Sequence, residues 1–349
     1  GEDYGSMTDV TLSSFTSSPA ETDMISVITN LDSDSQDNTI AGLDTVWTGN
    51  VDPPLASTAY EYQTTVKIYD SLGSTHDITV YYDRDSGAGD GEWEYLITCN
   101  PDEDARTNAA GTEGAGLLAR GSITFSTSSG SISSMTMERF DPENPSGAGD
   151  GTADWTTVSD VDNWQTAESP NTNGYLVFQP EFINGSPMTV EFDIGSRSPD
   201  NGVTWVPASL ASSQYSSAST TIFQSADGYG AGDLQSVSVD TDGVITGQYS
   251  NGQVIPLYRV ALAKFQNNDG LFKAGGNLYR ETRLSGDPIT GKPGSNGTGN
   301  ISANSLEQSN IDIANEFVKM ITTQRGFQAN SKIITVTDQM LAELINLKR

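Results

Sequence analysis

Few residues in this chain have the types and spacing that catalysis needs. His76 is the single histidine, and Asp70, Ser71, Ser74 and Asp77 lie close to it in the sequence. Serine, histidine and aspartate together could form a nucleophilic triad, in which the histidine takes the proton of the serine hydroxyl. The members of a triad converge from separate elements, however, and these residues all crowd into one predicted turn. We therefore predict no catalytic residue and no enzyme activity.

The sequence supports a metal or cofactor site as weakly as it supports a catalytic triad. A carboxylate-rich segment could bind calcium through Asp83, Asp85, Asp90, Glu92 and Glu94. It departs from the EF-hand pattern because Gly87 and Ala88 stand where the fifth ligand and the invariant glycine belong. Cys99 is the single cysteine, which excludes an intrachain disulfide and a cysteine-rich metal site. We predict an acidic surface loop, no bound metal and no cofactor.

The charge of the chain is concentrated in one part of it. The 349 residues contain 17 Lys and Arg against 46 Asp and Glu, a net charge of −29. Residues 1–222 hold 34 acidic and 6 basic side chains, so they carry −28 of this charge, whereas residues 301–349 hold five of each. So acidic a protein repels nucleic acid and anionic lipid. We expect the acidic part to face water and the neutral part to pack against copies of the chain.

The acidic part has the pattern of antiparallel β-structure. Apolar and polar residues alternate over 60–69, and alternation resumes over 78–82 after a turn at 70–74, which predicts a hairpin. Further strands are predicted around Trp93, Ile123, Tyr175 and Met188. Many short strands with Gly, Ser, Asn and Asp between them favour β-sandwich or barrel domains in tandem.

Residues 234–265 predict a three-stranded meander. Asp242-Gly243 and Asn251-Gly252 are strong hairpin signals, and we expect the last strand to run from Val254 to Phe265. The Ser-rich run 209–221 resembles a linker, and the Gly- and Pro-rich stretch after Leu284 predicts an extended arm.

The last segment alone has helical periodicity. Ser309 and Asp312 fit a capping box, and a long amphipathic α-helix is predicted over 309–349, with a bend or local unwinding near Gly326. Its apolar stripe needs a partner, as in a coiled coil, because an isolated helix is barely stable. The alternative is a helix folded back on its own sheet. The predicted assembly residues are Ile313, Phe317, Met320, Ile321, Phe327, Ile333, Val336, Met340, Leu344 and Leu347.

These patterns divide the chain into five predicted parts: an entry segment with a linker strand (1–35), one or two acidic outer β domains (36–222), an inner β domain (223–283), an extended arm (284–308) and a core helix (309–349). The predicted fold class is mostly β with one C-terminal helix. No stretch approaches 18 consecutive apolar residues, so no membrane insertion is expected.

Several motifs resemble those of bacterial flagellar axial proteins, and of the flagellar hook family above all. The run 304–312 and the helix positions Phe317, Gln324-Arg325, Asp338 and Leu347 resemble the carboxyl end of that family. The segments around Asp242-Gly243 and around Asn268-Asp269-Gly270 look like its inner β domain. Tyr69-Asp70-Ser71-Leu72-Gly73 followed by His76 looks like the opening hairpin of its outer domain.

The resemblance implies a structural subunit that assembles with its own copies into a curved tube, the universal joint between motor and filament. It implies contacts with rod, hook-cap and hook–filament junction proteins, passage through the flagellar export apparatus and an extracellular place in the flagellum. The family begins with a helix that pairs with the C-terminal one. Nothing like it stands here and the chain starts without Met, so we expect a hook protein lacking its N-terminal part.

Two other interpretations stay open at this point. A distal rod subunit would share the helix but lack so large an acidic region. A secreted adhesin or carbohydrate-binding module would use a surface carrying Trp93, Trp155, Trp164 and Trp205. The helix argues against the adhesin, which has no need of it.

Overall fold

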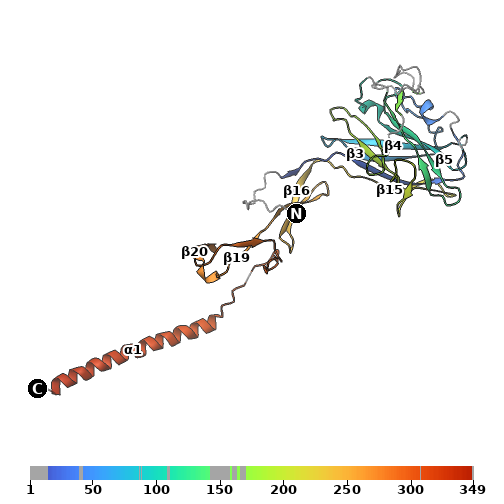
Figure 1. Ribbon diagram of the computed structural model, residues 1–349. Coiled ribbons are helices and arrows are strands. Elements are labelled where there is room, and N and C mark those ends of the chain that lie inside the picture. Colours follow the sequence, from blue (N-terminus) through green and yellow to red (C-terminus); the bar gives the residue numbers. More distant parts are fainter. Residues whose placement is uncertain are drawn as a thin grey trace. The chain divides into compact units, whose positions relative to one another are not determined.

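The computed structural model describes residues 15–38, 42–85, 87, 89–107, 111–141, 158, 163–165, 170–306 and 308–347. The chain divides into two compact units. Unit 1 comprises residues 1–238 and 244–259, and unit 2 comprises residues 239–243 and 260–349. The predicted fold class is confirmed, because strands are the main regular structure of unit 1, short strands recur in unit 2, and one long helix, α1 (Ile313–Leu347), follows them (Figure 1).

A seven-stranded sheet forms one layer of unit 1. Its strands run in the order β3 (Tyr62–Tyr69), β4 (Thr75–Arg84), β5 (Glu92–Cys99), β6 (Leu117–Phe125), β8 (Glu138–Phe140) and β9 (Trp164–Gln165), and β7 (Ile132–Met135) pairs with β6. The predicted hairpin is confirmed, with Val66 opposite Ile78 in an antiparallel register. Short 3-10 turns precede β3 at Leu43–Val46 and follow β5 at Pro101–Glu103.

A five-stranded sheet forms the second layer. Its order is β10 (Leu176–Phe178), β11 (Val190–Asp193), β2 (Met24–Asp32) and β14 (Ser213–Tyr215), with β15 (Thr220–Ala226) also paired with β2. Two of these pairings, β11 with β2 and β14 with β2, are parallel. A separate two-stranded ribbon joins β12 (Ser196–Arg197) to β13 (Val206–Pro207).

The core of unit 1 lies between these two sheets. Ile25 and Val27 of β2 and Phe192 of β11 belong to the same buried cluster as Val80 and Trp93 of the other sheet. The outer face of the seven-stranded sheet is covered too, by a second cluster in which Leu43 and Trp47 pack over Leu96. Strand β5 is therefore buried on both faces, since Trp93, Tyr95 and Ile97 point to one cluster and Leu96 to the other.

The Ser-rich run 209–221 is part of this sheet, so its assignment as a linker is wrong. Ser212 and Ser219 accept hydrogen bonds, through their hydroxyls, from the backbone N–H groups of Thr29 and Asp32 in β2, both at 3.0 Å. The serine hydroxyls here accept hydrogen bonds from backbone N–H groups of the sheet. A Ser-rich composition is the same in such a segment and in a flexible linker, so composition alone cannot distinguish them.

The predicted meander is confirmed and gains a fourth strand. The sheet runs β1 (Thr16–Ser17), β16 (Gly232–Val239), β17 (Val244–Tyr249) and β18 (Val254–Arg259). The last predicted strand does not continue to Phe265, because the chain changes partners. β19 (Leu262–Lys264) pairs instead with β22 (Ile289–Gly291), inside the stretch predicted to be an extended arm.

The rest of unit 2 is a hairpin and the helix. β20 (Phe272–Gly275) pairs with β21 (Leu278–Arg280), and a 3-10 turn at Asn268–Gly270 precedes them. Helix α1 is continuous through Gly326, so the expected local unwinding is absent from it. Its first turn is capped by Asp312, whose carboxylate accepts from the N–H of Ala314 at 2.8 Å, whereas the prediction placed the cap at Ser309.

Gly121 tests the packing of unit 1. A Cβ at this position in β6 would lie 2.0 Å from the carbonyl oxygen of Thr136 and 2.6 Å from the hydroxyl of Tyr95. We expect Gly121→Ala to lower the free energy of unfolding of unit 1 by about 1–3 kcal/mol through overpacking. Gly326→Ala is the control, since nothing lies within 4 Å of its added Cβ. Thermal unfolding that is equal in the two variants would contradict the packing described here.

Candidate assembly surface

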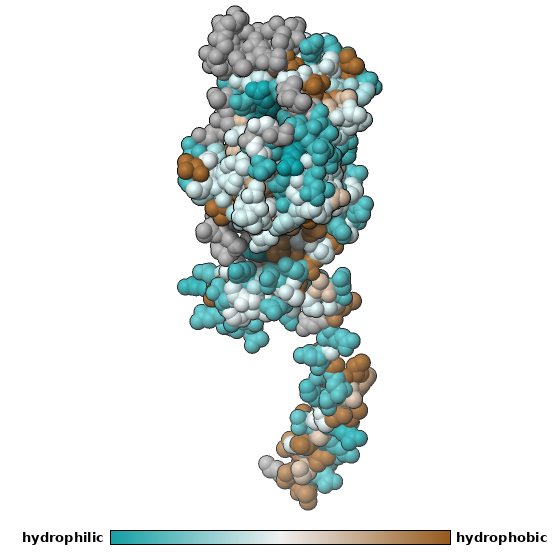
Figure 2. Space-filling model, turned by 90° about the vertical axis from the view of Figure 1, so that its right-hand side faces the viewer, coloured by the Kyte–Doolittle hydropathy of each residue, from teal (hydrophilic) through white to brown (hydrophobic). Residues whose placement is uncertain are grey.

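The predicted assembly residues are all exposed. Every described residue of α1 is exposed, and the helix has no buried residue. The values are 54% for Phe317, 74% for Phe327 and 82% for Leu347. Figure 2 shows hydrophobic side chains along the face of the helix that it presents. A helix of 35 residues, roughly 50 Å long, thus presents an apolar stripe to solvent.

The first half of α1 presents one apolar side. Ile313, Phe317, Met320, Gln324 and Phe327 follow one another at intervals of four and three residues, which places them on one face. The predicted residue Ile321, 45% exposed, and Val318, 59% exposed, lie beside this stripe, about 80° and 140° around the helix from Ile313. Beyond them the helix is polar, and there the hydroxyl of Thr322 donates to the carbonyl oxygens of Val318 and Lys319. This half therefore offers one continuous seam to a partner.

The second half presents two apolar sides. Ile333, Val336, Met340, Leu344 and Leu347 lie about half a turn around the helix from the first stripe, since each residue advances the helix by about 100°. This is the phase slip seen in the sequence.

The first stripe does not end at this slip. Continuing its intervals of four and three places Ile334, Leu341 and Ile345 on it, and these are 63%, 52% and 70% exposed. These three residues are not among the predicted assembly residues, although an unbroken heptad count includes them together with Ser331 and Asp338. The second half can therefore contact partners on two sides, about a third of a turn apart.

Unit 2 has further exposed apolar side chains outside the helix. Phe272, Leu278 and Tyr279 of the β20–β21 hairpin are 52–68% exposed, and Leu284 beyond it is 79% exposed. Arg280 lies over the ring of Phe272, with 5.3 Å from its guanidinium carbon to the ring centroid. A two-stranded hairpin is marginally stable alone in water, so this hairpin also needs a neighbour to pack against.

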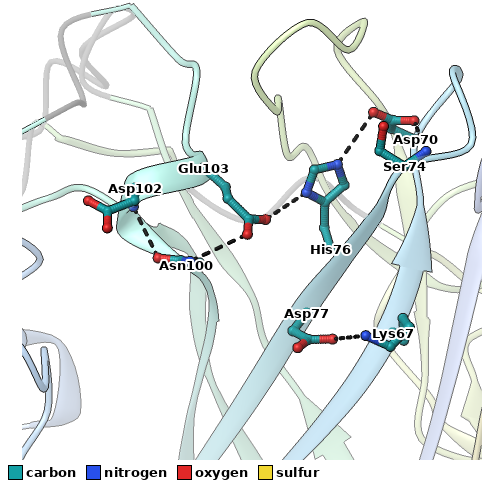
Figure 3. A network of polar contacts seen from close by, with 8 residues as sticks. All are labelled: Lys67, Asp70, Ser74, His76, Asp77, Asn100, Asp102 and Glu103. Atoms are coloured by element: carbon teal, nitrogen blue, oxygen red, sulfur yellow. Dashed lines mark hydrogen bonds and ion pairs between the residues drawn. The ribbon is translucent and has the colours of Figure 1, made fainter.

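His76 is not arranged as a catalytic base. Its two ring nitrogens face carboxylate oxygens of Glu103, at 2.7 Å, and Asp70, at 3.4 Å (Figure 3). A triad needs one ring nitrogen directed at a serine hydroxyl and the other at an acid. Both positions are taken by acids here, so the geometry gives no support to nucleophilic catalysis.

The tryptophans proposed for a carbohydrate-binding surface lie inside unit 1. Trp93, Trp164 and Trp205 are 0%, 2% and 9% exposed, and Trp155 lies outside the described residues. A sugar-binding platform needs exposed ring faces, which these three side chains do not provide. Among the described residues, no group of three or more His, Cys, Asp or Glu could hold a metal ion. The helix that the structure describes is not apolar enough to cross a membrane.

Comparison with known proteins identifies both ends of this architecture. The family model of the flagellar basal body protein FlaE D2 domain matches residues 30–229, which is more than half of the chain. The model of the flagellar basal body rod FlgEFG protein C-terminal region matches residues 302–347, the segment of α1.

Individual relatives agree with these models. The chain is 31% identical over 291 residues to the flagellar hook protein FlgE of Helicobacter pylori, covering 82% of this chain and 33% of that one. It is 46% identical over 118 residues to the flagellar basal-body rod protein FlgG of Bacillus subtilis, covering 34% of this chain and 45% of that one. A crystal structure of Helicobacter pylori FlgE2 aligns with a TM-score of 0.38 at 22% identity, over 71% of this chain and 43% of that one.

The chain spans about a third of the length of the first of these relatives. The D2 model nevertheless covers the acidic β-sandwich, and the C-terminal model covers the exposed helix, in the order that the sequence motifs indicated. From the family model that spans more than half of its length, the chain belongs to the flagellar hook protein family.

Proposed function

We propose that this chain is a structural subunit of the bacterial flagellar hook. Copies assemble into a flexible helical tube that transmits motor torque to the filament as a universal joint. The observation that carries this proposal is helix α1, whose apolar side chains are exposed along its whole length. Burying them against neighbouring copies removes apolar area from water, at about 25 cal/mol per Å².

The distribution of charge supports different roles for the helix and for the acidic sandwich in the proposed tube. Residues 301–349 are electrically neutral, so copies of the helix can approach without net repulsion, whereas residues 1–222 carry −28. In the proposed tube, α1 lies in the inner, firmly packed layer and the acidic sandwich faces solvent. Contacts between acidic, hydrated surfaces are weak and screened by salt, which lets neighbours slide as the tube bends.

The hook is a better assignment than the distal rod. The rod relative matches only about a third of this chain, whereas the hook relative matches 82% of it. Most of the acidic sandwich also lies within the D2 match, residues 30–229. Rod, hook-cap and hook–filament junction proteins and the export apparatus are the partners that this assignment implies, and the place is the extracellular part of the flagellum.

The first test concerns the single seam in the first half of α1. In the full-length protein, Phe317→Asp should abolish tube formation, because it places a charge in the buried stripe, and should leave the thermal unfolding of unit 1 unchanged. Thr322→Asp, on the polar side of the same half, is the matched control and should still assemble. Electron microscopy and sedimentation measure assembly, and deletion of residues 301–349 gives the fully defective reference.

Tubes that still form after that deletion would contradict the role of α1. A large fall in the melting temperature of unit 1 in Phe317→Asp would instead show that the helix packs on its own β domains.

The second test concerns the two apolar sides of the second half. Met340 and Leu341 are adjacent in sequence and lie on different stripes. If both sides are buried in the tube, Met340→Asp and Leu341→Asp should each reduce the sedimenting fraction by at least tenfold, since an unpaired buried charge costs several kcal/mol. Normal assembly of either variant would mean that this half of the helix has one interface.

A further inference from the structure

Helix α1 carries one acid inside its apolar stripe. Asp338 lies on the first stripe, four positions after Ile334 and three before Leu341. It is exposed in the subunit, like every described residue of the helix. When the proposed tube buries the stripe, this carboxylate is buried with it. A buried charge without a partner is strongly destabilising, so the surface that covers the stripe must supply a cation.

The turns of α1 around Asp338 do not supply that cation. Side chains on one helix meet when they stand three or four positions apart. Around Asp338 these positions hold Ile334, Thr335, Leu341 and Ala342, none of which is charged. The partner of Asp338 therefore comes from outside its own turns of the helix.

Copies of the same helix offer two bases for this role. The basic residues among the described part of α1 are Lys319, Arg325 and Lys332. Lys319 is engaged within the helix, because its Nζ lies 2.7 Å from a carboxylate oxygen of Glu316. Arg325 and Lys332 have no acid three or four positions away. Two copies of α1 are therefore complementary in charge, with an acid on one and a base on the other.

The residues one turn before the charges select Arg325. Ile334 precedes Asp338 by four positions, and Ile321 precedes Arg325 by four positions, so each charge has an isoleucine beside it. A shift of 13 residues between two parallel copies brings Asp338 of one level with Arg325 of the other. The same shift brings Ile334 level with Ile321. These isoleucines are 63% and 45% exposed in the subunit, so both are available for the contact.

The other base gives a poorer fit. Pairing Asp338 with Lys332 requires a shift of six residues, which brings Ile334 level with Gln328. An apolar side chain then meets an amide, and the burial that two isoleucines provide is lost. Arginine is also better suited than lysine to a buried pair, because its planar guanidinium can donate two parallel hydrogen bonds to a carboxylate.

The two surfaces lie on different sides of the helix. We call Ile334 and Asp338 the acid surface, and Ile321 and Arg325 the base surface. At about 100° per residue, they lie roughly 140° apart around α1. One copy can therefore use both at once, each with a different neighbour. A contact between two different surfaces repeats from copy to copy instead of closing into a pair, as a helical polymer requires.

We propose that an ion pair between Asp338 of one copy and Arg325 of the next sets the register of the helices in the tube. The isoleucines supply apolar burial, and the ion pair selects a parallel shift of 13 residues, which corresponds to about 20 Å along the helix axis. This inference rests on the proposed function, and it names the contact that orients neighbouring copies.

Charge reversal in the full chain tests the pair. Asp338→Arg and Arg325→Asp should each lower the sedimenting fraction at least tenfold, because like charges then face each other. The double variant Asp338→Arg/Arg325→Asp restores opposite charges and should form tubes again. The matched control is Asp338→Arg/Lys332→Asp, which has the same net charge and should stay unassembled. Thermal unfolding of unit 1 should be the same in all four variants.

Mixing the two single variants tests whether the pair joins different copies. The Asp338→Arg copy has a base at both positions, and the Arg325→Asp copy has an acid at both. Neither can form the pair with itself, but each can form it with the other. An equimolar mixture should therefore give tubes in electron micrographs, although each variant alone does not.

The possible failures are distinguishable. If wild-type copies form no tubes, the proposed function fails and the ion pair with it. If wild-type copies form tubes and a single charge reversal also assembles normally, the ion pair alone is overturned. Rescue of Asp338→Arg by Lys332→Asp instead of Arg325→Asp would overturn the shift of 13 residues. A mixture that stays unassembled while the double variant forms tubes would overturn a contact between copies.

Discussion

The structure depends on a contrast in how its apolar surface is buried. Unit 1 buries both faces of its central sheet, with Trp93 and Tyr95 inside the sandwich and Leu96 under the outer cluster. Helix α1 buries none of its apolar side chains. A long helix gains little from backbone hydrogen bonds alone, because nucleation is costly and water competes for the same groups. The sandwich therefore buries its apolar side chains, whereas those of the helix are left exposed, and in the proposed tube neighbouring copies would bury them.

The charged residues are also distributed differently between the sandwich and the helix. Most cations of the acidic segment are used for internal cross-links: Arg106 binds Asp104, and Arg120 binds Asp44 and Glu138 while lying over the ring of Trp164. The acidic excess is left for the surface. Acidic, hydrated surfaces make weak contacts that salt screens, whereas a neutral helix can pack closely. In the proposed tube, this difference would give firm inner contacts and loose outer contacts.

Local signals in the sequence were good guides to this fold. Alternation in β3 and β4, the Asp242-Gly243 turn and the helical periodicity after residue 309 each depend on neighbours in sequence, and each was predicted. What failed was long-range pairing. β2 lies between β11 and β14, which are more than 150 residues away from it in the sequence. The residue pattern of β2 does not indicate which strands it pairs with. β22 was missed for the same reason, since three residues in a Gly-rich stretch form a strand only because β19 lies beside them. On helix α1, the predicted assembly residues are exposed. The continuation of the first stripe into the second half of the helix was not predicted, because the pattern was interpreted as one stripe that changes position rather than as two stripes.

Compliance in unit 1 should be greatest where burial is least, and the two segments that lead to the four-stranded sheet, residues 18–23 and 227–231, are such a place because most of their residues are exposed or half-buried. Close approaches there are made by glycines: a Cβ at Gly228 would lie 2.2 Å from the hydroxyl of Thr22, and one at Gly232 would lie 2.5 Å from the side chain of Asn251. Polar contacts hold these segments: the Asn251 amide donates to the carbonyl of Gly230 at 2.8 Å, and the Asp227 carboxylate accepts from the N–H groups of Asp23 and Met24. Hydrogen bonds of this kind reform after small rotations, whereas an interdigitated apolar core resists them.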